Sequence, residues 1–201
     1  MFYVICFMIS IDEIKQLRQE TDVSVSECKK ALEEAKGDFE KAKEILRKWG
    51  RDLAGKKSSR EAREGIIESY IHSNKKIGVL LDLRCETDFV ARSKDFQKLA
   101  HEICLQIAAM NPLFLREEDI SEKFLDGEKK IYKEQLKGSG KPEKIINQII
   151  EGKLNKYKEQ VSLMSQSWIK DEEKTINDLI NEYVAKVGEN ITVKGFERYE
   201  I

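Results

Sequence analysis

The chain has 201 residues, of which 40% are hydrophobic and 36% are charged, and this length allows one or two domains. Its 36 Lys and Arg residues and 37 Asp and Glu residues leave a net charge of −1. A dedicated nucleic-acid-binding protein is disfavoured, because such proteins carry a marked basic excess. Only 2 prolines are present, and long stretches rich in Glu and Lys predict a mostly helical protein with solvated helix faces.

The first nine residues, MFYVICFMI, are apolar. They are too few to span a bilayer, which takes about 20 residues, and they lack the basic start and small-residue cleavage site of a signal peptide. We interpret residues 1–8 as a disordered or spurious extension with Met8 as the true start, and an exported protein is the alternative. No membrane association is expected.

Three short helices are predicted between residues 9 and 50. Capping-box patterns at 10–13 and 24–27 begin the first two. Asp38 is placed to cap the third, and Gly50 is expected to end it. Apolar residues recur at helical spacing and predict a small bundle with its own core: Cys28, Ala31, Leu32, Phe39, Ala42, Ile45, Leu46 and Trp49.

Residues 51–64 have almost no apolar face and are predicted to form a linker, with or without helical turns. Cations outnumber acids between Arg51 and Arg63. A solvated tether is favoured over a nucleic-acid patch, because no aromatic residue is interleaved with the cations.

Residues 65–201 combine strand and helix patterns. The predicted order is two strands joined by a turn (66–72, 73–75 and 76–83), a helix capped by Ser93 and ended by Asn111-Pro112, a pair of long helices broken at 138–142 (117–136 and 145–161), an irregular segment (164–170), a helix (175–187), a turn (188–190) and a strand (191–199). We therefore expect an α+β fold, in which a small antiparallel sheet packs with helices and a helical hairpin.

No catalytic, metal or cofactor site stands out. Four scattered cysteines and two histidines show neither a C-x-x-C nor an H-x-x-x-H pattern, which disfavours a structural zinc site. Residues 50–56, GRDLAGK, nearly complete a phosphate-binding loop, but Lys57 stands where Ser or Thr is needed and a helix precedes. His101 and Cys104 lie one helical turn apart on a core stripe, where packing is more common than catalysis. An enzyme is disfavoured, and isolated cysteines are typical of the cytoplasm.

Six stretches of the chain, taken in order, resemble the elongation factor Ts family. They are CKKALEEAKGDFEKAKEILRKWG (28–50), YIHSNKKIGVLLDLRCETDFVAR (70–92), IAAMNPLFL (107–115), EGKLNKY (151–157), KDEEKTINDLINEY (170–183) and VGENITVKGFERYE (187–200). The resemblance implies that residues 9–50 form a module of the ubiquitin-associated type. It also implies that residues 65–201 form one core half that binds partners and dimerises, because short members of this family rebuild a double core as homodimers.

The resemblance further implies a function in translation elongation, as the guanine-nucleotide exchange factor of elongation factor Tu. The chain would bind this GTPase in its GDP-bound and nucleotide-free forms, without direct contact to nucleic acid. Thr87, Asp88, Phe89 and Val90 would insert near the Mg²⁺ and phosphates of the partner. The alternative is that Phe89 is a core residue at the junction of strand and helix and that Asp88 caps the helix.

Eight further residues are candidate partner contacts by the same resemblance: Val23, Val25, Gln106, Met110, Asn111, Gly188, Glu189 and Asn190. Each could equally serve in capping or in the core. The rival function is an interaction adaptor, with a helical module tethered to an α+β domain, that binds ribosomes or nascent chains.

Overall fold

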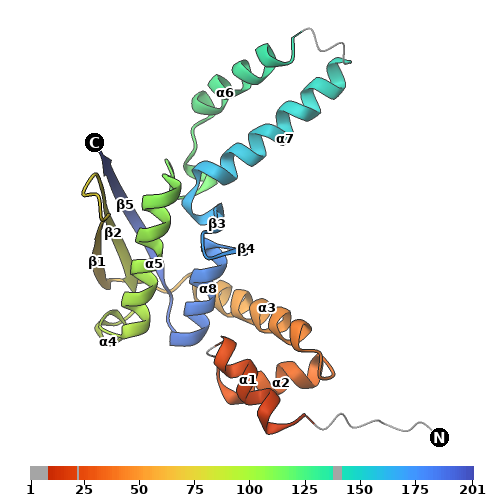
Figure 1. Cartoon of the computed structure of the whole chain (residues 1–201), viewed down its shortest axis with the longest axis vertical. Helices are drawn as coiled ribbons and strands as arrows, with labels where there is room; N and C mark the ends of the chain where they lie inside the picture. Colours follow the sequence, from red (N-terminus) through yellow and green to blue (C-terminus); the bar gives the residue numbers. More distant parts are fainter. Residues whose placement is uncertain (1–8, 22, 138–141) are drawn as a thin grey trace, which may run out of the picture. The chain divides into compact units, whose positions relative to one another are not determined.

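The computed structural model describes residues 9–21, 23–137 and 142–201 (Figure 1). The expectations for residues 1–8 and for the break at 138–141 lie outside this part of the chain. The chain divides into two units. The first unit contains the residues up to Ile66 together with 84–99 and 178–192, and the second contains 67–83, 100–177 and 193–201.

Three helices form the N-terminal bundle of the first unit: α1 (Ile11–Thr21), α2 (Val25–Glu34) and α3 (Phe39–Lys57). The capping box before α1 is confirmed, because Ser10 Oγ accepts from the Glu13 amide at 3.1 Å while Glu13 accepts from the Ser10 amide at 2.7 Å. Ser24 and Asp38 each accept from a backbone amide three residues on, those of Glu27 and Lys41, and so cap α2 and α3. Local side-chain chemistry therefore sets where each helix begins.

The core of the bundle contains most of the predicted apolar stripe. Its fully or largely buried members are Leu17, Cys28, Ala31, Leu32, Ala35, Ala42 and Leu46. Phe39, Ile45 and Trp49 are partly buried and pack against this core. The predicted bundle is confirmed, and burial of these side chains is the main source of its stability.

The predicted end of the third helix at Gly50 is wrong, because α3 continues to Lys57. Gly50 is buried and faces α8 (Ile176–Val187): a Cβ at Gly50 would lie 3.7 Å from Ala185 Cβ and 3.7 Å from the Asn181 carbonyl oxygen. Gly50 therefore lies where two helices pack together rather than at the end of one, and a Cβ there would meet its neighbours at ordinary van der Waals distance.

A three-stranded sheet is formed by β1 (Glu64–Ile71), β2 (Ile77–Cys85) and β5 (Thr192–Glu200), in the order β1-β2-β5. The predicted hairpin and final strand are confirmed. In β2 alternate residues are buried, namely Val79, Leu81, Leu83 and Cys85, as expected for a strand with one face on a core.

Helix α5 (Lys94–Met110) begins at Ser93, whose hydroxyl accepts from the Phe96 amide at 3.2 Å. Its predicted apolar face is fully buried: Phe96, Leu99, Ala100, Ile103 and Ile107. The helix ends at Asn111, which has a left-handed backbone with φ 46°. These predictions are confirmed.

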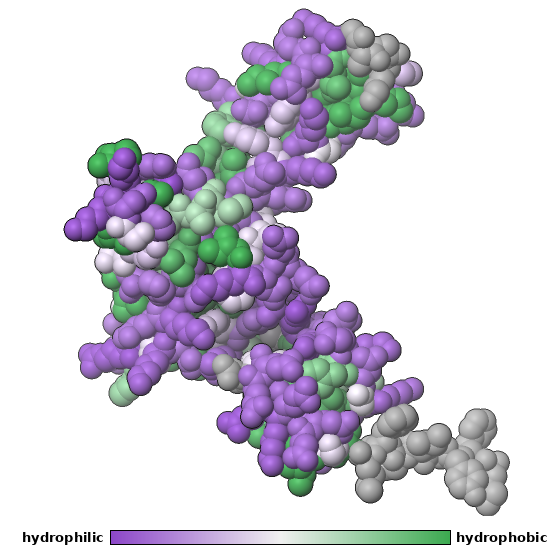
Figure 2. Space-filling view, viewed as in Figure 1, coloured by the Kyte–Doolittle hydropathy of each residue, from purple (hydrophilic) through white to green (hydrophobic). Residues whose placement is uncertain are grey.

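The predicted helical hairpin of the second unit is formed by α6 (Glu122–Gln135) and α7 (Glu143–Val161) (Figure 1). The rings of Phe124 and Tyr157 stack across it with centroids 6.1 Å apart, and hydrophobic residues gather on this hairpin in Figure 2. The first helix does not begin near Glu117 as predicted. A 3-10 turn, η1 (Glu117–Asp119), comes first, and Ser121 then caps α6.

The segment predicted to be irregular (164–170) overlaps a 3-10 turn, η2 (Leu163–Ser165), and contains β3 (Ser167–Trp168). This strand pairs with β4 (Asp171–Thr175), which follows the segment, in a two-stranded antiparallel ribbon. A strand of two residues is too short to show a period of two in a sequence, which is why the ribbon was not predicted. The mixture of helices with a small antiparallel sheet confirms the α+β fold class. The division into domains at residues 9–50, 51–64 and 65–201 stays a prediction.

Candidate partner-binding site

A one-turn helix, α4 (Asp88–Ala91), follows directly on β2 and carries the predicted wedge. Thr87 is its N-cap, with extended backbone angles of φ −128° and ψ 155°, and Thr87 Oγ1 accepts from the Val90 amide at 3.4 Å. Ala91 is buried beneath the turn. A β-branched, hydroxyl-bearing residue suits this position, because it continues the strand and then satisfies a free amide of the helix.

Phe89 projects into solvent with 84% of its surface exposed, whereas Phe96, one helix further on, is fully buried. Asp88 does not cap the helix; its carboxylate lies 3.2 Å from the Arg92 guanidinium, one turn along the chain. The alternative interpretation, in which Phe89 is a core residue and Asp88 is the cap, is therefore wrong on both counts. The Phe89 ring is thus accessible to a partner, and aromatic side chains are among the residues that contribute most to binding energy at interfaces.

The Glu189 carboxylate holds the base of α4. Its Oε2 accepts from the backbone amides of Glu86 and Thr87 at 3.1 and 3.0 Å, and its Oε1 accepts from the Thr87 hydroxyl at 2.6 Å. Hydrogen bonds to an ionised carboxylate are shorter and stronger than neutral ones. The turn after α8 and the end of β2 are thus joined by one side chain.

The end of α3 and the residues after it also contact Glu86 and the Gly188–Asn190 turn. The Asn190 amide donates to Glu86 Oε1 at 2.7 Å, and Asn190 Nδ2 donates to the Arg60 carbonyl oxygen at 2.7 Å. Arg60 itself pairs with Glu86 at 3.5 Å, and Lys57 Nζ donates to the Gly188 carbonyl oxygen. Residues 51–57 thus continue α3, and Lys57 and Arg60 contact the Gly188–Asn190 turn. The assignment of residues 51–64 as a linker stays a prediction.

The thiols of Cys85 and Cys104 are poor nucleophiles. Burial raises the pKa of Cys104 to about 12, and the neighbouring Glu68 carboxylate adds to the effect. Burial likewise raises the pKa of Cys85, whose Sγ lies 3.1 Å from the Thr87 carbonyl oxygen, to about 11. Reactive cysteines have lowered pKa values, so the proximity of His101 and Cys104 in sequence reflects packing.

Two of the other predicted contacts lie in the loop before α2 and at its start. Val23 packs against the core of the bundle, whereas Val25 is 52% exposed. Of this pair, only Val25 presents a substantial apolar surface to solvent.

Three more predicted contacts lie on α5 or at its end. Gln106 is fully buried, and its amide nitrogen donates to Gln166 Oε1 at 3.1 Å and to the Ser167 carbonyl oxygen at 3.0 Å, while its oxygen accepts from the Ile169 amide at 3.0 Å. This favours a core role for Gln106. Met110 is 48% exposed, and Asn111 ends the helix.

The last three predicted contacts, Gly188, Glu189 and Asn190, are brought to Thr87. Gly188 has φ 78°, which turns the chain out of α8, and the other two form the hydrogen bonds described above. Sequence reasoning missed Glu86 and Arg60, which complete this cluster. No local pattern could have found them, since Glu86 and Glu189 are 103 positions apart.

Across residues 9–21, 23–137 and 142–201, no three His, Cys, Asp or Glu side chains are grouped as a metal ion would require. Every helix in the same ranges is too short or too polar to cross a lipid bilayer.

The chain is similar to known proteins over nearly all of its length. The family model described as "Elongation factor TS" matches residues 11–201. The chain is 54% identical to an "Elongation factor Ts" of Thermosipho melanesiensis over 194 residues, which cover 96% of this chain and 99% of that protein. It is 53% identical to one of Thermotoga maritima and to one of Thermodesulfovibrio yellowstonii, each over 193 residues that cover 96% of both chains. The chain therefore belongs to the elongation factor Ts family.

Proposed function

We propose that the chain promotes release of GDP from elongation factor Tu in the cytoplasm, and that Thr87–Val90 is the segment that enters the partner near its Mg²⁺ and phosphates. The observation that carries this proposal is the 84% exposure of Phe89 on a turn that the Glu189 carboxylate anchors. Family membership supports the general function, and the exposed ring supports the choice of segment.

The physical basis of the proposal is linkage between two binding equilibria. A protein that binds the nucleotide-free GTPase more tightly than the GDP-bound form must weaken GDP by the same factor. Phe89 supplies packing energy at a low cost in side-chain entropy, as aromatic hot spots do at about 2 kcal/mol or more. The Asp88 carboxylate places negative charge beside a metal-phosphate site, where it competes for the cation.

The test is the release of a fluorescent GDP from elongation factor Tu at saturating concentrations of the chain. Phe89→Ala and Asp88→Ala should each slow release, and the double variant should slow it most. Leu113→Ala is a matched control, because Leu113 is a 54% exposed apolar residue outside this segment. Release at the wild-type rate by a folded Phe89→Ala variant would contradict the proposal.

We propose in addition that the second unit forms a homodimer through the outer face of its sheet. Ile67 and Ile71 of β1, Leu80 of β2 and Tyr199 of β5 are 47–68% exposed, and a hollow of about 380 Å³ lies between Ile71, Leu80 and Tyr199. An apolar sheet face of this kind favours a partner surface. Light scattering of the wild type should give a molar mass twice that of the chain, and the Leu80→Asp variant should have the mass of a monomer. A monomeric wild type at micromolar concentration would contradict the dimer.

A further inference from the structure

We infer that Glu189 is the positioning residue of this site: its carboxylate fixes the backbone that presents Asp88 and Phe89, and it acts through that segment rather than by touching the partner. This inference rests on the proposed function, which assigns the exchange activity to Thr87–Val90. It gives the Gly188–Asn190 turn a defined role in the same site.

Both carboxylate oxygens of Glu189 accept hydrogen bonds from within the chain. Oε2 accepts from two backbone amides, and Oε1 accepts from the Thr87 hydroxyl at 2.6 Å. The side chain is therefore directed at the end of β2. A contact with another protein would have to compete with three charge-assisted hydrogen bonds.

Helix α4 is too short to be stable by its own hydrogen bonds. It has four residues, Asp88–Ala91, and an isolated helical turn of that length is unstable, because nucleation fixes several backbone angles for very few hydrogen bonds. The exposed Phe89 ring adds no packing of its own. An external anchor is thus needed if Phe89 is to be presented in one orientation.

Glu189 is connected to the turn that carries Phe89 through the Thr87 hydroxyl. The Thr87 hydroxyl donates to Glu189 and at the same time accepts from the Val90 amide. Rotation of this hydroxyl away from Glu189 would also release the cap of α4. Glu189 therefore controls both the strand end at Thr87 and the first turn that carries Phe89.

The backbone on both sides of Glu189 is itself fixed by hydrogen bonds. Gly188 leaves α8 with φ 78°, and its amide donates to the Val184 carbonyl oxygen at 2.9 Å. The next residue, Asn190, donates to Glu86 Oε1 at 2.7 Å. Glu189 thus accepts from the amides of Glu86 and Thr87, while Glu86 accepts from the amide that follows Glu189. These reciprocal hydrogen bonds hold the two segments together.

The experiment compares Glu189→Ala with Glu189→Gln in the fluorescent-GDP assay, with the chain at increasing concentration. Glu189→Ala should lower the maximal rate by about tenfold or more, since hydrogen bonds to a charged group contribute that much, with a smaller change in the concentration for half-maximal rate. Glu189→Gln should retain most of the rate, because its oxygen can still accept from the two backbone amides. An equal loss in both variants, or none in Glu189→Ala, would overturn the inference.

A second measurement separates positioning from direct contact and from general destabilisation. Amide hydrogen exchange of Glu189→Ala without partner should rise by about tenfold or more in peptides covering 85–92, while the α1–α3 bundle keeps its protection. If Glu189→Ala unfolds the first unit, Glu189→Asp, which keeps the charge but is one methylene shorter, takes its place in both measurements. Unchanged exchange at 85–92 would overturn the inference.

The third measurement is a double-mutant cycle with Phe89→Ala. If Glu189 acts through Phe89, Glu189→Ala should add little to the loss caused by Phe89→Ala; independent effects would add. Full additivity would overturn the positioning role and leave the proposed function standing. A Phe89→Ala variant with normal activity would instead contradict the proposed function, whatever Glu189→Ala does.

Discussion

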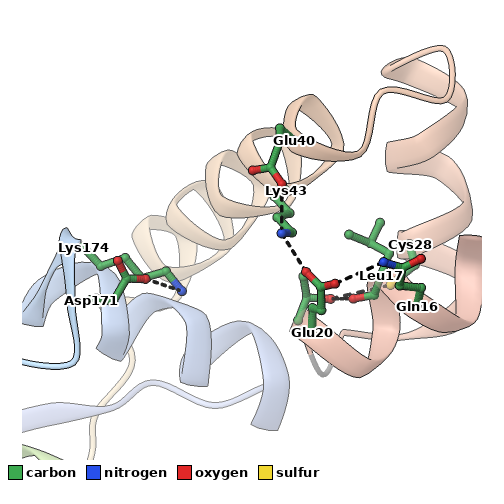
Figure 3. A network of polar contacts seen from close by, with 9 residues as sticks. Gln16, Leu17, Glu20, Cys28, Glu40, Lys43, Asp171 and Lys174 are labelled. Atoms are coloured by element: carbon green, nitrogen blue, oxygen red, sulfur yellow. Dashed lines mark hydrogen bonds and ion pairs between the residues drawn. The ribbon is translucent and has the colours of Figure 1, made fainter.

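The ammonium group of Lys43 lies 2.6 Å from the Glu20 carboxylate and so joins α3 to α1 (Figure 3). Glu40, one turn before Lys43, accepts from the same ammonium at 3.1 Å. The hydrogen bond from Lys43 lowers the pKa of Glu20 from its ordinary value of 4.5, and the hydrogen bonds to Glu20 and Glu40 raise the pKa of Lys43 above 10.5.

We therefore predict a pH dependence for the bundle. A lowered carboxylate pKa gives stability that is present above pH 4.5 and lost as the pH falls through the pKa of the folded state. The raised Lys43 pKa gives stability that is present below pH 10.5 and lost above it. Lys43→Met should flatten the acid limb of thermal unfolding curves between pH 3 and 5, by a small amount because these groups are exposed. An acid limb identical to that of the wild type would contradict this role.

Gly50 gives a test of the close approach between α3 and α8. A Cβ at this position fits at ordinary van der Waals distance from Ala185, so Gly50→Ala should stabilise the helix by about 0.5–1 kcal/mol in urea unfolding. Gly50→Leu should destabilise by about 1–3 kcal/mol, because the extra atoms have no room. At the control position Gly55, where a Cβ would meet no atom within 4 Å, both substitutions should be tolerated. Equal behaviour of Gly50→Leu and Gly55→Leu would argue against the contact.

Gln106 tests whether a predicted partner contact is structural. Gln106→Ala should destabilise the protein by about 2 kcal/mol or more, since it leaves the side-chain oxygen of the buried Gln166 and the Ser167 carbonyl oxygen without their donor. Met110→Ala in the same helix should change stability little, because Met110 is 48% exposed. If Gln106→Ala weakened the complex with elongation factor Tu at unchanged stability, the partner-contact interpretation would be right instead.

Val23 and Val25 should respond differently to a charge. Val25→Asp should leave unfolding almost unchanged, because the side chain is 52% exposed, yet it should weaken the complex with elongation factor Tu if the bundle docks there. Val23→Asp should destabilise the bundle, since Val23 packs against its core. Calorimetric titration and thermal unfolding of both variants give the comparison. Unchanged affinity for Val25→Asp would remove this loop from the interface.

Cys104 should be inert in the folded protein. Because burial raises its pKa to about 12, iodoacetamide at pH 8 should label Cys104 only after denaturation, as followed by mass spectrometry of its peptide. Because the pKa of Cys104 is raised on folding, the buried thiol contributes to the stability of the folded state below pH 9.0, the ordinary pKa of a thiol. This contribution is lost as the pH rises toward 12. Rapid labelling of native Cys104 would show that α5 opens readily.

The helices and the β1–β2 hairpin could be predicted because their signals are local. Ser10, Ser24, Asp38 and Ser93 each stand where a side-chain oxygen must meet a free amide, and each does so. The interior of α3 was mispredicted because Gly50 has low helix propensity, and the contact with α8 that outweighs it is invisible in the local sequence. The residues after Gly50 show no apolar stripe because the helix contacts its neighbours there partly through charged side chains. Arg51 Nε, for example, donates to Asp178 Oδ1 at 2.8 Å.

The candidate site also has one part that the sequence could predict and another that it could not. Thr87–Val90 could be identified because adjacent residues carry the family resemblance. The exposure of Phe89 could not be predicted, since a phenylalanine between a strand and a helix is more often buried. The contact between Glu189 and Thr87 joins positions 102 apart. No pattern within one segment encodes such a pair, and only the folded chain brings the two residues together.

That separation has a consequence for the order in which the protein is made. Thr87–Val90 leaves the ribosome about a hundred residues before Glu189, and chains emerge from the N-terminus at about 5–20 residues per second. During that interval Thr87–Val90 is complete in sequence but lacks the Glu189 carboxylate. Under the proposed function, we therefore expect a chain released before Gly188 to carry the whole of Thr87–Val90 and yet to be inactive in nucleotide exchange.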